Sequence, residues 1–165
     1  MAKRTDKKTN ALRILDGLGI PYETRTYPCD GVNFDGVLVA EQVGLPPSSV
    51  FKTLLCKGDK AGEIAVCVIP VDKKLDLKAL AAAHGVKRLE MAHLDELLPL
   101  TGYIRGGCSP VGMKKHYPTY IDSSVQNWET VAVSAGLRGL QMLLRPADLI
   151  RACSGSLGSF GVELD

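Results

Sequence analysis

The chain has 165 residues, of which 45% are hydrophobic, and its 20 Lys and Arg residues against 18 Asp and Glu residues give a formal net charge of +2. This length allows one domain with a substantial core, and the small net charge excludes a histone-like coating of nucleic acid while permitting a basic face. The sequence contains neither the ~18 apolar residues of a membrane span nor the apolar run of a signal peptide. We expect a single cytoplasmic domain over residues 1–165, with no membrane partner.

The five cysteines, at positions 29, 56, 67, 108 and 153, form no C-x-x-C pair. Cys56 and Cys67 stand in apolar runs, where thiols usually act as small hydrophobic residues. This pattern predicts a reducing compartment without structural disulfides or zinc, so neither a metal nor a cofactor is expected.

Helix and strand signals alternate along the chain. Caps and apolar periodicity predict helices that begin at Thr9, Gly36, Asp76, His93 and Pro146 and end at Gly19, Val43, Gly85, Leu98 and Ala152. Strands are expected at 22–27, 50–56, 63–71, 86–91, 119–122, 130–134 and 140–144, the second and third forming a hairpin. Small polar residues predict a flexible tail at 153–165. Together these elements predict an α+β fold, with a curved, mixed, barrel-like sheet surrounded by peripheral helices.

The segment 101–115, TGYIRGGCSPVGMKK, is the first candidate for chemistry and is called the glycine loop below. Gly106 and Gly107 have no side chain to block close approach, so their amides can hold an anion or a polarised carbonyl. A tight connection with no ligand is the open alternative. The run GCSPVGMK is close to a phosphate-binding P-loop, but Met113 displaces the lysine and Pro110 removes an amide, so nucleotide hydrolysis is not predicted.

Lys52 is the polar exception in the strand-like run VFKTLL. Strand alternation places it on one face with Val50 and Leu54. A buried ammonium between apolar neighbours is costly without a partner, so Lys52 indicates a cavity that supplies an anion or a polar ligand. An edge-strand lysine that extends into water is the alternative.

No nucleophile and base pair is visible in the sequence. The three histidines, at 84, 93 and 116, lie outside any recognisable nucleophile signature. Cys108 and Ser109 lie in the glycine loop without an adjacent base, so we expect a packing thiol and a turn serine there.

Four ordered runs resemble a known family: VFKTLL at 50–55, PVDKKLDLKALA at 70–81, TGYIRGGCSPVGMKKHYPTYID at 101–122 and SAGLRGLQMLL at 134–144. The chain resembles the YbaK family of stand-alone aminoacyl-tRNA deacylases, which are similar to the editing domain of bacterial prolyl-tRNA synthetases. This resemblance implies a trans-editing hydrolase that cleaves the ester of mischarged Cys-tRNA(Pro) and supports translation fidelity. It leaves open whether prolyl-tRNA synthetase is a required partner, and whether the protein is a monomer or a weak dimer.

The resemblance also implies roles for individual residues. Lys52 matches a strand lysine associated with the terminal adenosine, and Gly106 and Gly107 match glycines whose amides contact the aminoacyl carbonyl, so these three form the expected catalytic set. The expected substrate-binding residues are Tyr27, Ser109, Gln141 and Lys114. In cysteine-specific members the substrate's own thiol is thought to attack its ester, so the protein positions the reactants and needs no triad.

Gln141 departs from the family pattern, which commonly has Asp or Glu at this position. An amide can form hydrogen bonds but cannot act as a carboxylate base. The alternatives are therefore a deacylase for Ala-tRNA(Pro) or another small-amino-acid tRNA, a noncatalytic module that binds tRNA or a synthetase, and, least favoured, a phosphate-ligand domain.

The cations expected to contact tRNA are Lys73, Lys74, Lys87, Arg88, Lys114, Lys115 and Arg138.

Overall fold

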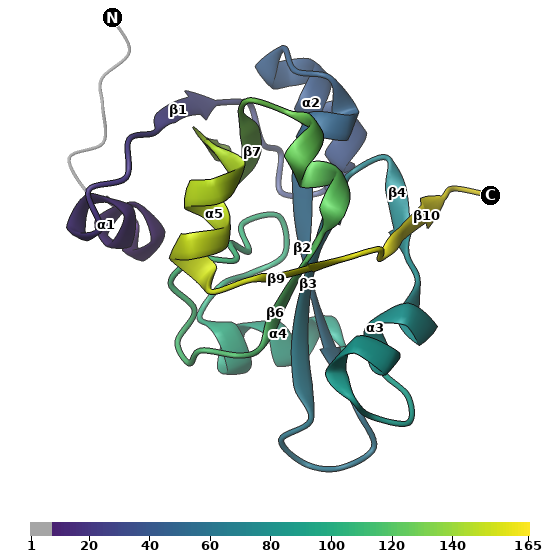
Figure 1. Cartoon of the computed structure of the whole chain (residues 1–165). Helices are drawn as coiled ribbons and strands as arrows, with labels where there is room; N and C mark the ends of the chain where they lie inside the picture. The colour runs from purple at the N-terminus through teal and green to yellow at the C-terminus, as the bar shows by residue number, and fades with distance from the viewer. Residues whose placement is uncertain (1–7) are drawn as a thin grey trace, which may run out of the picture.

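Five α-helices surround three β-sheets in the computed structural model, which describes residues 8–165 (Figure 1). The helices are α1 (Asn10–Gly17), α2 (Gly36–Val43), α3 (Leu77–His84), α4 (Leu94–Thr101) and α5 (Pro146–Cys153). The strands are β1 (Glu23–Thr26), β2 (Phe51–Lys57), β3 (Ile64–Pro70), β4 (Lys73–Leu75), β5 (Glu90–Met91), β6 (Thr119–Asp122), β7 (Val131–Leu137), β8 (Leu140–Leu144), β9 (Ser156–Gly158) and β10 (Gly161–Glu163). Short 3-10 helices lie at Pro47–Ser49 and Ser123–Asn127. No helix within residues 8–165 is both long and apolar enough to span a bilayer.

The helices begin at side chains that satisfy free backbone amides. Thr9 accepts a hydrogen bond from the Leu12 N–H at the start of α1, and Asp76 accepts one from the Ala79 N–H at the start of α3. α3 ends at Gly85, which takes a left-handed conformation with φ of 74°. These local signals explain why all five predicted helices are confirmed, with only α4 extending well beyond its predicted end.

The central sheet has five strands in the order β5-β2-β3-β6-β9. β2 and β3 form the predicted antiparallel hairpin, while β3 with β6 and β6 with β9 are parallel pairs, so the sheet is mixed as expected. Val68 and Ile121 pack against Met142 in one core cluster, and Ile69 packs with Leu80 of α3 in another. The sheet therefore has apolar contacts on both faces.

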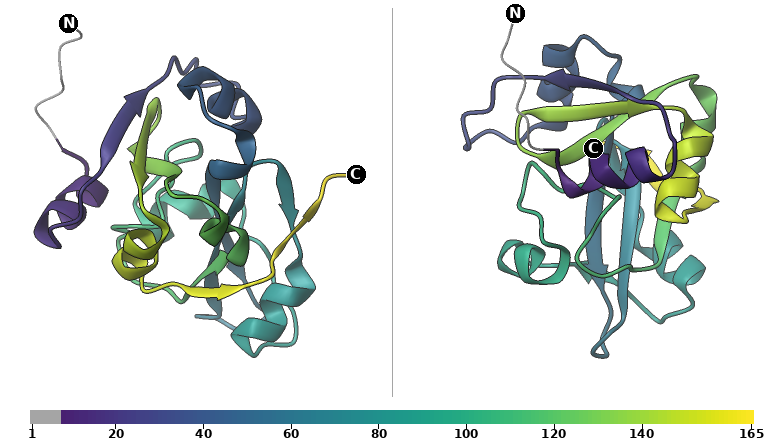
Figure 2. Two further views of the ribbon diagram at one scale, coloured as in Figure 1. Left: turned by 45° about the horizontal axis from the view of Figure 1, so that its top comes forward. Right: turned by 90° about the vertical axis from the view of Figure 1, so that its left-hand side faces the viewer.

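The strands of the described residues do not close into the predicted barrel. β1, β8 and β7 form a separate antiparallel sheet, and β10 pairs with β4 in a third (Figure 2). A single parallel bridge between Val50 and Ala132 links the start of β2 to β7. The mixed α+β class is thus correct. The two larger sheets, however, are joined by one isolated bridge and not by a continuous ladder of hydrogen bonds, as a closed barrel would require.

The segment 153–165, for which small polar residues predicted a flexible tail, contains β9 and β10. The tail is attached by long-range contacts. Phe160 is 3% exposed in the cluster that includes Leu80, and one carboxylate oxygen of Asp122 accepts hydrogen bonds of 2.8 Å from the amides of Phe160 and Gly161. Composition alone did not reveal these contacts, because they depend on a distant aspartate.

Candidate functional site

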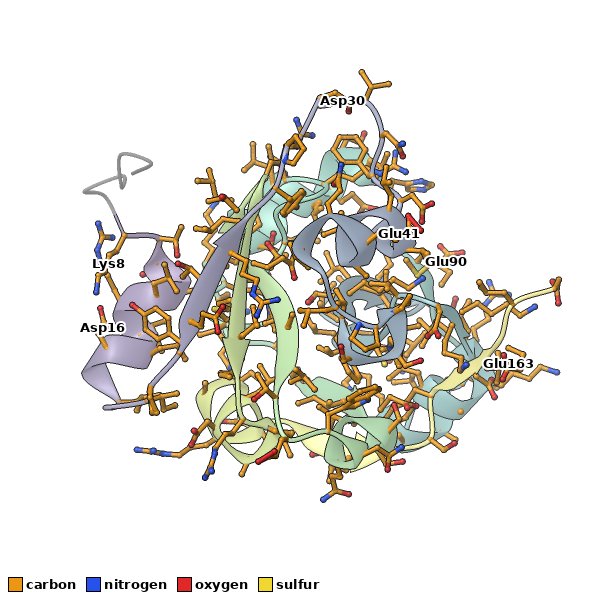
Figure 3. All side chains as sticks on the ribbon, turned by 90° about the horizontal axis from the view of Figure 1, so that it is seen from above. Lys8, Asp16, Asp30, Glu41, Glu90 and Glu163 are labelled. Atoms are coloured by element: carbon orange, nitrogen blue, oxygen red, sulfur yellow. The ribbon has the colours of Figure 1, made fainter. Side chains whose placement is uncertain are left out.

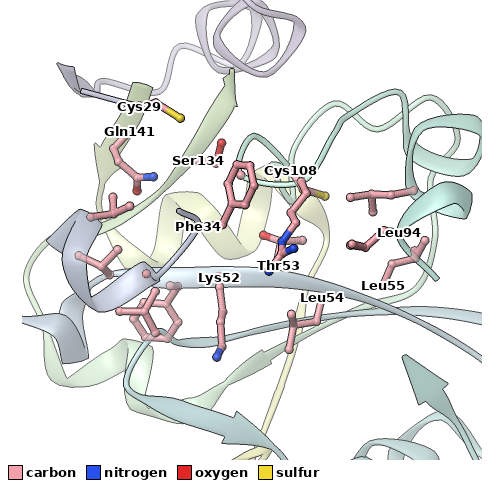
Figure 4. A pocket seen from close by; sticks show the side chains of 18 of the residues that line it. Cys29, Phe34, Lys52, Thr53, Leu54, Leu55, Leu94, Cys108, Ser134 and Gln141 are labelled. Atoms are coloured by element: carbon pink, nitrogen blue, oxygen red, sulfur yellow. The ribbon is translucent and has the colours of Figure 1, made fainter. Parts of the chain in front are cut away.

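A cavity of about 420 Å³ lies alongside an open edge of β2 (Figure 4). β3 pairs with one edge of β2 over its whole length, whereas β5 pairs with the other edge only at Cys56 and Lys57. Residues 50–55 all line the cavity beside this uncovered stretch. The other walls come from the loop between β1 and α2, the glycine loop, the facing side of β7 and β8, and the start of α4.

The hydrogen-bond pattern of β2 directs the backbone of Thr53 toward this open edge. Alternate residues of an antiparallel strand point their N–H and C=O groups to opposite edges. The Val50 carbonyl accepts from Val71 beside β3, and the Leu55 carbonyl accepts from Ala92 on the other side. Because Thr53 is two residues from Leu55, its N–H and C=O point to the same edge as the Leu55 carbonyl, which is the edge beside the cavity. The Thr53 hydroxyl is also buried without a hydrogen-bond partner among the described residues.

Lys52 lies half-buried in the cavity wall. It extends from the same side of β2 as Leu54, in agreement with the predicted alternation (Figure 4). Burial lowers the pKa of the Lys52 ammonium, and the carboxylates of Asp35 and Asp72 act in the opposite direction. Its ammonium makes no hydrogen bond or ion pair within residues 8–165, so its donors are free to bind an anionic or polar ligand.

Asp72 is a neighbour of Lys52 that sequence reasoning missed. Ser48 donates a 2.8 Å hydrogen bond to one carboxylate oxygen of Asp72. The other oxygen is buried and has no partner in the described part of the chain. Asp72 follows the β2–β3 hairpin within the run PVDKK, where an isolated acidic residue gives no local signal of a site.

The glycine loop contributes Gly106 to the cavity, whereas Gly107 does not line it. Gly106 has a φ of +85°, and a Cβ atom there would lie 2.6 Å from a ring carbon of Phe34. The Gly107 amide already donates a 2.9 Å hydrogen bond to the Ile104 carbonyl. Of the two glycine amides that were predicted to contact a carbonyl, the Gly107 N–H is thus engaged within the loop, and the Gly106 N–H has no hydrogen-bond partner among the described residues.

Two of the predicted substrate-binding residues lie outside the cavity. Ser109 is fully buried, and its hydroxyl accepts a 3.2 Å hydrogen bond from the Val111 amide, which fixes the loop. Lys114 is exposed and donates to the Pro99 carbonyl of α4. These contacts give both residues a place in the architecture of the glycine loop, away from the groups that line the cavity.

The thiol of Cys108 does line the cavity. Burial raises its pKa to about 12, so the thiolate form is scarce at neutral pH. Because a nucleophilic cysteine acts as the thiolate, the surroundings of Cys108 do not favour attack by this residue.

Gln141 closes the end of the cavity nearest β8. It is 6% exposed, it pairs across the strands with Ser134, and its side-chain oxygen is buried without a hydrogen-bond partner in the described residues. Tyr27 and Cys29 line the same region, and Figure 4 shows Cys29 next to Gln141. An unpaired buried amide oxygen costs free energy, so this end is suited to a ligand that donates a hydrogen bond.

The opposite end of the cavity is apolar. Met91, Leu94 and Leu97 line it around β5 and α4, together with Leu54 of β2. Leu94 is 63% exposed, so the apolar surface continues outside the cavity. The site therefore combines a polar end, a central lysine and glycine, and an apolar end suited to a flat or aliphatic group.

Comparison with known proteins places this site in a family. The sequence matches the family described as aminoacyl-tRNA editing domain over residues 37–152. EbsC of Enterococcus faecalis, provisionally named a Cys-tRNA(Pro)/Cys-tRNA(Cys) deacylase, is 43% identical over 153 residues, which cover 93% of each chain. A proline–tRNA ligase of Trichlorobacter lovleyi is 29% identical over 97 residues, which are 59% of this chain and 17% of the ligase.

A solved structure, provisionally described as a trans-editing enzyme for prolyl tRNA synthetase, has the same fold. Its TM-score is 0.81 at 21% sequence identity, and the match covers 95% of this chain and 99% of the other. The family match begins in α2 and ends in α5, so it includes Lys52, the glycine loop and Gln141. On this evidence the chain belongs to the aminoacyl-tRNA editing domain family.

Proposed function

We propose that this protein is a trans-editing deacylase that hydrolyses the aminoacyl ester of mischarged Cys-tRNA(Pro). The observation that carries the proposal is that Lys52, Gly106 and Gln141, whose side-chain oxygen is unpaired among the described residues, all line one cavity. The name and 43% identity of the Enterococcus relative support the amino acid and the tRNA. The cavity volume of about 420 Å³ suits the aminoacylated end of a tRNA better than a larger part of the molecule.

An editing site is needed because synthetic pockets discriminate poorly between small side chains. A pocket shaped for proline can reject a smaller amino acid by only ~1–3 kcal/mol per missing methylene. A second site that hydrolyses the wrong ester removes the error without demanding more from the first. The reaction requires a positioned nucleophile and stabilisation of the carbonyl oxygen as it becomes negative.

In the proposed mechanism the substrate supplies the nucleophile. Its cysteine sulfur attacks the ester carbonyl carbon, the bond from that carbon to the ribose oxygen breaks, and the thiol proton passes to the ribose oxygen. Water then opens the resulting thiolactone to free cysteine. The Gly106 N–H stabilises the carbonyl oxygen, while Lys52 holds a ribose or phosphate oxygen of the terminal nucleotide.

Gln141 positions the amino acid in this mechanism. Its unpaired oxygen accepts a hydrogen bond from the substrate's α-ammonium group, which lies next to the reacting carbonyl. Tyr27 forms part of the same wall. Because Gln141 stands where a carboxylate is common, a preference for Ala-tRNA(Pro) or another small amino acid is the second candidate function.

A panel of acylated tRNAs tests the proposal. Purified protein is incubated with Cys-tRNA(Pro), Cys-tRNA(Cys), Ala-tRNA(Pro), Ser-tRNA and Pro-tRNA(Pro), and ester loss is compared with spontaneous hydrolysis. We expect the fastest loss for Cys-tRNA(Pro). Preferential loss of Ala-tRNA(Pro) would support the second candidate, and binding without any ester loss would instead indicate a noncatalytic module.

The proposal also includes a cytoplasmic location and tRNA(Pro) as the partner. Repeating the panel with and without prolyl-tRNA synthetase tests the role of that enzyme. A rate increase confined to tRNA(Pro) substrates would show that the synthetase contributes to tRNA selection. Equal rates in both conditions would show that the deacylase selects its substrate alone.

A further inference from the structure

Two arginines share the aromatic ring of Phe34, which lines the cavity. The guanidinium carbon of Arg105 lies 4.9 Å from the centre of the Phe34 ring, and that of Arg138 lies 4.6 Å from it. Arg138 Nε also donates a 2.7 Å hydrogen bond to the Arg105 carbonyl, which ties the two segments together. Phe34 and Arg105 line the cavity, and Figure 4 shows the Phe34 ring above β2. The two cations are thus held in a defined arrangement next to Gly106.

Neither guanidinium has an acidic partner within residues 8–165. The ion pairs of the described chain involve other cations, at positions 8, 25, 57, 73, 74 and 88. Asp30, at the tip of the neighbouring loop, accepts hydrogen bonds from the amides of Val32 and Asn33 (Figure 3). Asp35 caps α2. Two like charges held close to one ring repel each other, so the arrangement favours an anion near them.

Stacking leaves the hydrogen-bond donors of both arginines available. A cation–π contact uses the flat face of the guanidinium, whereas its N–H donors project from the edge of the same plane. Only Nε of Arg138 is engaged, by the Arg105 carbonyl, and Arg105 makes no side-chain hydrogen bond among the described residues. The ring therefore restrains two guanidinium groups, each of which carries a fork of donors that matches a phosphate group.

We propose that Arg105 and Arg138, stacked on Phe34, bind the phosphodiester that joins the 3′-terminal nucleotide of the RNA to the nucleotide before it. This inference rests on the proposed function, because it requires an aminoacyl ester in the cavity and an RNA chain that leaves through its mouth. Gly106 serves both parts of the site. Its bare Cα accommodates Phe34 and the Arg138 side chain, which would lie 2.6 Å and 3.4 Å from a Cβ atom there.

Substrates with and without the phosphate test the proposal. Steady-state hydrolysis is measured for 3′-cysteinyl adenosine, which lacks a phosphate, and for the same ester on adenosine 5′-monophosphate and on tRNA(Pro). Arg105→Gln and Arg138→Gln are compared with Arg13→Gln, a control at an exposed arginine on α1 that does not line the cavity. Thermal melts verify that each variant folds.

For the two phosphate-bearing substrates we expect each cavity variant to lose about tenfold in kcat/KM, mainly through KM, as is typical of one charged hydrogen-bond partner. For 3′-cysteinyl adenosine the variants and the wild type are expected to be equal. The plot of log kcat/KM for the tRNA against log salt concentration is expected to become shallower by ~0.7 per lost phosphate contact. Equal losses on all substrates, or no loss on any, would overturn the proposal.

A binding measurement separates this inference from the proposed function. An unacylated RNA hairpin ending in CCA is titrated with each protein, so no hydrolysis is needed. We expect weaker binding by about tenfold for Arg105→Gln and Arg138→Gln and no change for Arg13→Gln. If the two arginine variants bind the hairpin about tenfold more weakly than the wild type, but the wild type hydrolyses no ester, the proposed function fails while the phosphate site stands. If the arginine variants bind as the wild type does, the phosphate site fails.

Discussion

Lys52 combines a charge with a half-buried position, and this combination makes its protonation sensitive to its neighbours. Burial lowers the pKa of its ammonium, while Asp35 and Asp72 raise it. The group therefore loses its proton at a lower pH than an ordinary lysine, whose pKa is 10.5. Since the protonated form is the one that binds an anionic or polar oxygen, activity is expected to fall as pH rises through this lowered pKa.

Asp72→Asn tests this electrostatic coupling. Removing the carboxylate removes one influence that raises the Lys52 pKa, so the alkaline decrease in kcat/KM is expected to move to lower pH. Rates are corrected for spontaneous ester hydrolysis at each pH. Asp59→Asn is the matched control, because Asp59 pairs with exposed Arg88. An alkaline limb at the same pH in both variants and the wild type would contradict the coupling.

Gly106 and Gly102 offer a comparison between strain alone and strain with a clash. Both have positive φ values, +85° at Gly106 and +83° at Gly102. A Cβ atom at Gly106 would lie 2.6 Å from the Phe34 ring, whereas one at Gly102 would lie 3.7 Å from Lys114 Cβ, which is an ordinary contact. We expect Gly102→Ala to lower the free energy of unfolding by about 1 kcal/mol and to leave kcat/KM unchanged. Gly106→Ala is expected to cost about 3 kcal/mol and to lower kcat/KM. Chemical denaturation and steady-state kinetics measure the two effects, and identical behaviour of the variants would contradict a role for close packing.

Gln141 is expected to show opposite effects on stability and activity. Gln141→Leu replaces a buried amide, whose oxygen has no partner in the described chain, with an apolar group. We expect the free energy of unfolding to rise by about 1 kcal/mol and kcat/KM for Cys-tRNA(Pro) to fall. Gln126→Leu, at an exposed position, serves as the control. A variant with unchanged activity would show that the amide does not contact substrate.

At the level of the elements, the C-terminal strands depend on one buried carboxylate. Burial acts to raise the pKa of Asp122, but hydrogen bonds from Ser124, Gly161 and Phe160 together hold it below its ordinary value of 3.8. A carboxylate with a lowered pKa in the folded state adds stability above the unfolded-state pKa. That contribution disappears as pH falls through the lowered folded-state value.

Asp122→Asn is therefore expected to destabilise the protein by about 2 kcal/mol at pH 7. The difference between wild type and variant is expected to shrink as the pH is lowered through 3.8 and below. Urea denaturation at a series of pH values measures it, and hydrogen exchange of residues 156–163 reports on the attachment of β9 and β10. A stability difference that does not vary with pH would contradict the assigned role of the carboxylate.

The elements that the sequence predicted well are those with local signals. Thr9, Asp76 and Pro146 mark helix starts through groups within a few residues, and the β2–β3 hairpin has its turn between two apolar runs. β4, β9 and β10 were missed because KKL, SLG and GVE are short and lack a distinctive alternation. Their pairing depends on residues far along the chain, which local patterns do not report.

At the scale of the whole molecule, part of the lining of the candidate cavity could be predicted from the sequence. Lys52, Gly106, Tyr27 and Gln141 come together from separate elements to line one cavity. The residue types alone could not show that the Gly107 amide is used within a turn or that Lys114 contacts α4. Phe34 and Arg105 went unnoticed because their contact forms only when the β1–α2 loop meets the glycine loop.

The most direct measurement is single-turnover hydrolysis of Cys-tRNA(Pro) with the protein in excess over substrate. If the cavity positions the substrate thiol against its own ester, the ester is expected to decay at least about 100-fold faster than spontaneously, given the large gains that orientation provides. Pro-tRNA(Pro) is expected to decay at its spontaneous rate. Spontaneous decay of Cys-tRNA(Pro), or equally fast loss of Pro-tRNA(Pro), would contradict the proposed editing activity.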